Sequence, residues 1–72
     1  MRLLFQSKAN RDQRVRELRY QGFRVRRSSI RNQQLHPEYV ADWQGSVERG
    51  PGNTQYRTFF STLYILETDI WR

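Results

Sequence analysis

The chain has 72 residues, a mean hydropathy of −0.96 and a formal net charge of +6, carried by twelve arginines and one lysine against seven acidic residues. It has no cysteine, which excludes disulfides and thiolate metal sites. Its longest apolar run, Leu63 to Leu66, is far shorter than the ~20 residues of a membrane span. We therefore expect one small basic domain over residues 1–72, without a membrane span and with a cytoplasmic location.

The small size limits the core. A chain of this length buries only about 60% of its unfolded surface. Ten aromatic residues nevertheless argue against disorder, because disordered chains contain few of them. Without disulfides or metal, a thin core is completed by a partner chain, by self-association into a homo-oligomer or by unusually good packing.

The first expected elements are a short strand and a helix. Leu3, Leu4 and Phe5 form an apolar run typical of a buried strand. Asn10 is an expected helix N-cap and Gly22 a C-terminal stop, which predicts a helix over residues 11–21.

The expected helix has a narrow apolar stripe. At ~100° per residue, Val15 and Leu18 lie within one sector, with arginines at 14, 16 and 19 on the flanks. The helix therefore buries one thin edge, and its rim is basic.

The next segment, residues 23–26, alternates like a strand. The alternation then fails, because Val25 and Arg27 share a face and Ile30 falls on the other. A bulge or a strand end near Arg27 and Ser28 accounts for this break. The alternative is a second helix over residues 26–36.

Two further strands are expected in the second half. Residues 39–43 alternate, and Gly45 marks a bulge. A strong turn signal follows at residues 49–53. Residues 56–67 then alternate, and they are apolar on both faces from 59 to 66, which is typical of a central strand.

These elements predict an α+β fold with the order β-α-β-β-β. One helix packs on a mostly antiparallel sheet, and the last two strands form a long C-terminal hairpin. The crossover through the helix makes the first two strands parallel.

The charge is unevenly distributed. Residues 1–36 hold ten basic and two acidic side chains, a balance of +8, whereas residues 37–72 hold three basic and five acidic ones, a balance of −2. Such asymmetry predicts a polyanionic partner for one end. Arginine, unlike lysine, binds phosphate in a bidentate manner and stacks on flat rings. The other explanation of the arginine excess is a GC-rich genome that favours arginine codons.

The densest cluster, the basic stripe, is our candidate for binding nucleic acid or an acidic protein surface. Counterion release favours phosphate backbones on such a surface, and an interleaved tyrosine can stack an exposed base. Its members are Arg16, Arg19, Tyr20, Arg24, Arg26, Arg27 and Arg31.

No catalytic, metal or cofactor site is predicted. His36 is the only histidine, and no serine lies in a nucleophile elbow. Glycines 50 and 52 flank a proline but precede a strand pattern, whereas a phosphate loop precedes a helix.

Two function classes remain. One is a non-enzymatic RNA-binding module. The alternative is an assembly or regulatory subunit that docks on an acidic surface of a larger complex, with Trp43 and Trp71 as docking residues because tryptophan is enriched at binding hot spots. A C-terminal Trp71 either folds back on the domain or docks elsewhere. Salt separates the classes, since RNA binding weakens steeply as salt rises.

Overall fold

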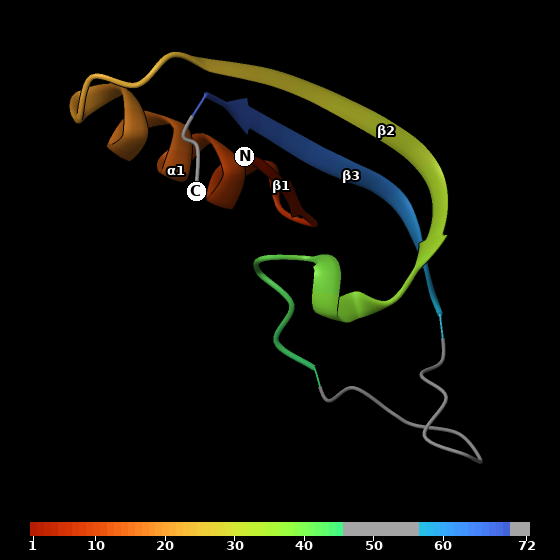
Figure 1. Cartoon of the computed structure of the whole chain (residues 1–72). Coiled ribbons are helices and arrows are strands. Elements are labelled where there is room, and N and C mark those ends of the chain that lie inside the picture. Colours follow the sequence, from red (N-terminus) through yellow and green to blue (C-terminus); the bar gives the residue numbers. More distant parts are fainter. Residues whose placement is uncertain (46–56, 70–72) are drawn as a thin grey trace.

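A computed structural model describes residues 1–45 and 57–69 and shows one helix packed on a three-stranded sheet (Figure 1). The strand order is β1-β3-β2, and β3 runs antiparallel to both neighbours. The elements in chain order are β1 (Arg2–Phe5), α1 (Lys8–Tyr20), β2 (Val25–Leu35), a 3₁₀ helix (Pro37–Tyr39) and β3 (Thr58–Thr68). The predicted α+β class is confirmed, as are the parallel directions of the first two strands, between which β3 lies.

Helix α1 begins three residues earlier than predicted. Its N-cap is Ser7, whose hydroxyl accepts a hydrogen bond from the Asn10 amide at 3.3 Å. The Asp42 carboxylate adds a second cap and accepts from the backbone amides of Gln6 (2.8 Å) and Ser7 (3.0 Å). Asn10 was therefore the wrong cap, because it lies within the first turn and donates its amide to the Ser7 hydroxyl. Gly22, at φ +95°, ends the helix as predicted.

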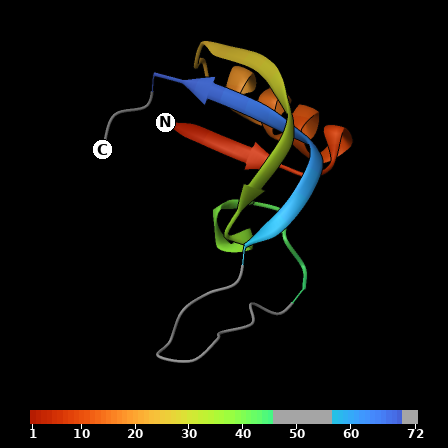
Figure 2. The same cartoon turned by 90° about the vertical axis from the view of Figure 1, so that its right-hand side faces the viewer.

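The first core cluster lies between α1 and the sheet. The predicted stripe of Val15 and Leu18 packs on Phe5, Val25 and Leu66. Figure 2 shows α1 behind one face of the sheet, with the 3₁₀ helix below the curved ends of β2 and β3. The thin apolar edge of the helix is thus its buried side.

The predicted third strand over residues 39–43 is wrong. Pro37 starts a 3₁₀ helix there, and Val40 makes only an isolated bridge to Leu4. This segment instead buries Val40 and packs Trp43 against Phe60, forming the second core cluster. The long partner of β3 is therefore β2, which also rules out the alternative helix over 26–36. The predicted turn at 49–53 lies outside the described residues.

Gly45 allows a close contact with the Trp43 side chain and does not mark a strand bulge. A Cβ at this position would lie 2.8 Å from Cζ2 of Trp43, which is closer than real contacts allow. The indole also meets Phe60 edge-to-face at 5.9 Å between centroids. Because glycine has no Cβ, the backbone at residue 45 can lie close to the Trp43 ring.

No bulge occurs near Arg27 and Ser28. The pairing runs without insertion from Val25–Thr68 to Arg31–Thr62. Val25 belongs to the first core cluster and Ile30 packs against the second, on the other face. The broken alternation thus reflects two cores on opposite faces of one strand.

The irregular residue of β2 is Asn32, at φ +57°. The pairing keeps its register across this residue, from Arg31–Thr62 to Gln33–Phe60. Asn32 therefore adopts the left-handed conformation without adding a residue to the strand.

Replacing Asn32 tests this geometry. Asn32→Val is expected to lower the free energy of unfolding by about 1–2 kcal/mol, because a β-branched residue is strained in the left-handed region. Asn32→Gly is expected to be nearly neutral. Urea denaturation of both variants measures the difference, and equal stability of the two would contradict the left-handed backbone.

Candidate nucleic-acid interface

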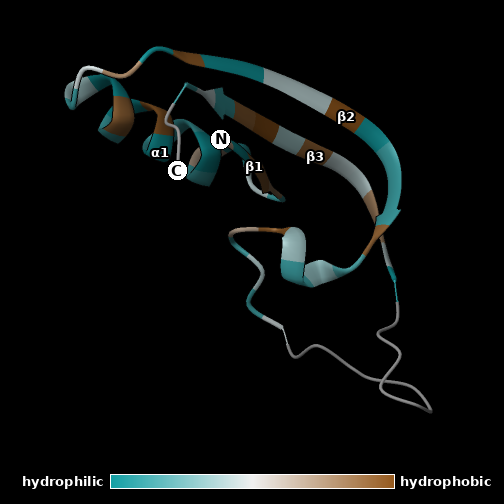
Figure 3. Ribbon diagram, in the orientation of Figure 1, coloured by the Kyte–Doolittle hydropathy of each residue, from teal (hydrophilic) through white to brown (hydrophobic). Residues whose placement is uncertain are grey.

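Strand β2 is at the edge of the sheet, and in the described part of the chain its outer side pairs with no other strand. Most of its residues are polar and exposed. Figure 3 shows β2 in teal on either side of a white and brown central part, in keeping with an apolar Ile30 between polar neighbours. Charged residues protect an edge strand from unwanted pairing. They also place the arginines of β2 where a large ligand can reach them.

The structure divides the basic stripe between two faces. Arg27 and Arg31 alternate with Arg26, so they lie on the α1 side of the sheet and Arg26 lies on the opposite side. Arg19 lies on the flank of α1 nearest β2, since its Nη2 donates to the Val25 carbonyl at 3.2 Å. Arg16, three residues earlier, shares this flank. The basic stripe therefore consists of two basic strips, one on each face of the sheet. Both lie next to the free edge of β2.

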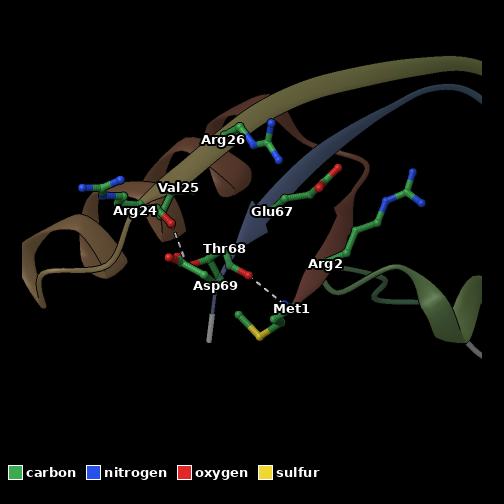
Figure 4. A pocket seen from close by; sticks show the side chains of 8 residues that line it. All are labelled: Met1, Arg2, Arg24, Val25, Arg26, Glu67, Thr68 and Asp69. Atoms are coloured by element: carbon green, nitrogen blue, oxygen red, sulfur yellow. Dashed lines mark hydrogen bonds between the residues drawn. The ribbon is translucent and has the colours of Figure 1, made fainter. Parts of the chain in front are cut away.

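On the face opposite α1, Arg24 and Arg26 line a hollow of about 560 Å³ (Figure 4). Arg2, Glu67 and Arg26 stand side by side on β1, β3 and β2. Thr68 donates its hydroxyl hydrogen to the Arg24 carbonyl at 2.9 Å, which holds the start of β2 against β3. Glu67 and Asp69 lower the local charge but leave the three arginines of the hollow, Arg2, Arg24 and Arg26, in excess.

On the α1 side, Arg11 forms a cluster that sequence reasoning missed. Its side chain is only 7% exposed, and its Nη1 donates to the Ser28 carbonyl at 2.9 Å. Its guanidinium carbon lies 5.5 Å from the centroid of the Tyr64 ring. The available signal was spacing, because Arg11 precedes Val15 and Leu18 by four and seven residues on the same helical stripe.

Asp12 is the carboxylate of this cluster. It accepts from Nε of Arg11 at 2.7 Å and lies 3.6 Å from Nη1 of Arg27. Partial desolvation raises the pKa of Asp12, but the Arg11 hydrogen bond and the charges of Arg11, Arg27 and Lys8 outweigh it and hold this pKa below 3.8. The carboxylate is therefore surrounded by the positive charges of Arg11, Arg27 and Lys8.

Two aromatic residues lie beside the arginines. Tyr20, at the end of α1, is 94% exposed, and Phe23 is 37% exposed. Tyr20 thus presents nearly its whole ring to solvent, next to Arg19 in the chain. Such a ring is available for stacking on a planar ligand.

The predicted docking residues have different positions. Trp43 is partly buried in the second core cluster, so most of its ring is used for packing within the protein. Trp71 lies outside the described residues. Neither position tests a docking role.

A metal site is not evident in residues 1–45 and 57–69. They contain no group of three or more His, Asp or Glu side chains placed to hold a metal ion. Within these ranges, Nδ1 of His36 is buried without a hydrogen-bond partner. None of the described helices is long and apolar enough to cross a membrane.

Comparison with known proteins gives no further guide to the site, because no family model, curated protein or solved structure matches this chain.

Asp12→Asn tests the electrostatics of the cluster. Because the pKa of Asp12 is lowered in the folded state, its charge stabilises the protein above pH 3.8, and this contribution is lost as the pH falls through the folded pKa. At neutral pH the variant is therefore expected to melt at a lower temperature than the wild type. The two melting curves are expected to converge as the pH falls through the lowered pKa of Asp12. A pH-independent difference between them would contradict the role of the charge.

Proposed function

We propose that this chain is a small non-enzymatic module that binds RNA through the free edge of β2. The single observation that carries the proposal is the convergence of two basic strips on one exposed strand. The interface, called the edge surface below, comprises Arg16, Arg19, Tyr20, Arg24, Arg26, Arg27 and Arg31.

The edge surface suits a phosphate backbone. Arginine presents a planar fork of donors that matches phosphate oxygens. The acidic groups beside it are Asp12 on one face and Glu67 and Asp69 on the other, against six arginines. An RNA strand that displaces counterions from this excess of positive charge gains free energy at low salt.

Single-stranded RNA fits better than duplex DNA. The common major-groove readers place the second helix of a helix-turn-helix pair on the bases. The described residues contain one α-helix, α1, and no second α-helix to pair with it. The exposed Tyr20 ring at the end of the strip supplies a stacking partner for an unpaired base.

A second candidate, docking on an acidic protein surface, is favoured by a different feature. A groove of about 310 Å³ on the face opposite α1 is lined by Leu4, Ile30, Leu35, Leu63 and Tyr39, with Arg2 and Gln33. An apolar groove beside arginines matches an acidic partner that also carries an apolar side chain. The two candidates differ in salt dependence, because apolar contacts are little affected by salt.

The test is a binding titration of a labelled single-stranded RNA at several salt concentrations. The variant Arg24→Glu/Arg26→Glu is expected to weaken binding at least about tenfold and to reduce the salt slope by about 1.4, since each lost phosphate contact removes about 0.7. The reason is that both arginines flank the free edge of β2.

The matched control is Arg14→Glu/Arg57→Glu, which changes the net charge by the same amount. Arg14 pairs with Glu17 at 3.7 Å, and Arg57 is exposed just before β3. The control is expected to lose much less affinity. Equal losses in both variants, or wild-type binding that is insensitive to salt, would show that the arginine excess reflects composition rather than an interface.

A further inference from the structure

A small pocket lies between the first turns of α1 and the middle of β2. Its volume is about 250 Å³, and its lining residues are Lys8, Arg11, Arg27, Ser28, Ser29 and Tyr64. Sites for drug-sized ligands usually span about 300–1,000 Å³. This pocket therefore suits a small group rather than a base or a peptide side chain.

The lining carries an excess of two positive charges. Lys8, Arg11 and Arg27 contribute three, and Asp12, which contacts both arginines, contributes one negative charge. The carboxylate of Asp42, at the start of α1, is occupied by the backbone amides of Gln6 and Ser7. The helix N-terminus is thus already capped, and the excess charge belongs to the side chains.

Arg11 is held in a fixed position in the pocket wall. Its hydrogen bonds to Asp12 and to the Ser28 carbonyl, together with the Tyr64 ring, determine where its charge lies. A charge that needs no rearrangement on binding interacts more strongly with a ligand. Ser29 and Tyr64, which pair across β2 and β3, bring two hydroxyl-bearing side chains to the same wall.

We propose that this pocket binds a phosphomonoester group. Above its second pKa of about 6, such a group carries nearly two negative charges, which match the excess in the pocket. A phosphodiester or a carboxylate carries only one. The exposed guanidinium of Arg27 and the hydroxyl groups are suitable donors for its oxygens, while Arg11, whose Nε and Nη1 are already paired, contributes its charge. This site binds an isolated anion and shares only Arg27 with the edge surface, so phosphate binding can be tested without RNA.

The first measurement is thermal unfolding with inorganic phosphate, compared with chloride at equal ionic strength and at a pH above 7. Low millimolar concentrations avoid the general stabilisation that phosphate produces by exclusion from protein surfaces. At about ten times its dissociation constant, phosphate is expected to raise the Tm by about 9 °C. An equal rise with chloride would overturn the proposal.

Neighbouring arginines on opposite faces of β2 provide the matched pair of variants. Arg27→Gln is expected to abolish most of the phosphate-induced rise, whereas Arg26→Gln is expected to retain it. Ser29→Ala provides a second test that leaves every charge in place and is expected to reduce the rise. Asp12→Asn removes the competing carboxylate, so its rise is expected to exceed that of the wild type. A rise that is unchanged in Arg27→Gln would overturn the proposal.

An RNA oligonucleotide with and without a 5′-phosphate identifies the source of the group. Tighter binding of the phosphorylated form to the wild type, lost in Arg27→Gln, supports a terminal RNA phosphate. A rise with inorganic phosphate but no preference between the oligonucleotides supports a small phosphomonoester. If RNA does not bind at all and the rise persists, the edge-surface proposal fails while the pocket stands.

Discussion

The need to cover both faces of β3 organises this molecule. Leu63 and Leu66 of β3 are completely buried although they point to opposite faces. Helix α1 covers only one of these faces. The segment from the 3₁₀ helix to Trp43 covers part of the other, so a connection that resembles a strand in sequence becomes the second layer of the core.

Because β3 is the central strand and β2 lies at the edge, most of β2 is not buried. As an edge strand it buries Val25, while most of its other positions are exposed to solvent. Arginines can therefore occupy successive positions and appear on both faces. The same arrangement brings Arg27 near Asp12 and Arg11, so the surface charge is continuous with a charged cluster in the interior.

Local patterns were enough to predict α1, β1 and the central strand. Val15 and Leu18 show the helical period, Gly22 marks the helix end, and the apolar residues from 59 to 66 mark a strand buried on both faces. The pairing partner of β3 could not be predicted, because residues 39–43 alternate as well as β2 does. Their real position depends on Pro37 and on packing with Phe60, a contact distant in sequence.

The sequence was enough to predict which arginines form the candidate site, but not how they are arranged in space. The arginines from 24 to 31 were evident as a cluster. Their division between two faces follows from the register with β3 and from the edge position of β2, which no local pattern contains. Arg11 was overlooked because a charged residue on an apolar stripe conflicts with the expected pattern until its buried partners are known.

The second cap of α1 has a consequence for how the chain folds. The amides of Gln6 and Ser7 and the side chain of Asn10 all donate to a carboxylate that lies 36, 35 and 32 positions later. The residues that lead into the helix, and the side chain of Asn10, thus acquire these hydrogen bonds only after a distant loop has docked. Nucleation of a short helix is unfavourable without such tertiary support. The helix and the loop therefore belong to one cooperative unit, and the folding rate depends on closing a long stretch of chain rather than on local helix formation.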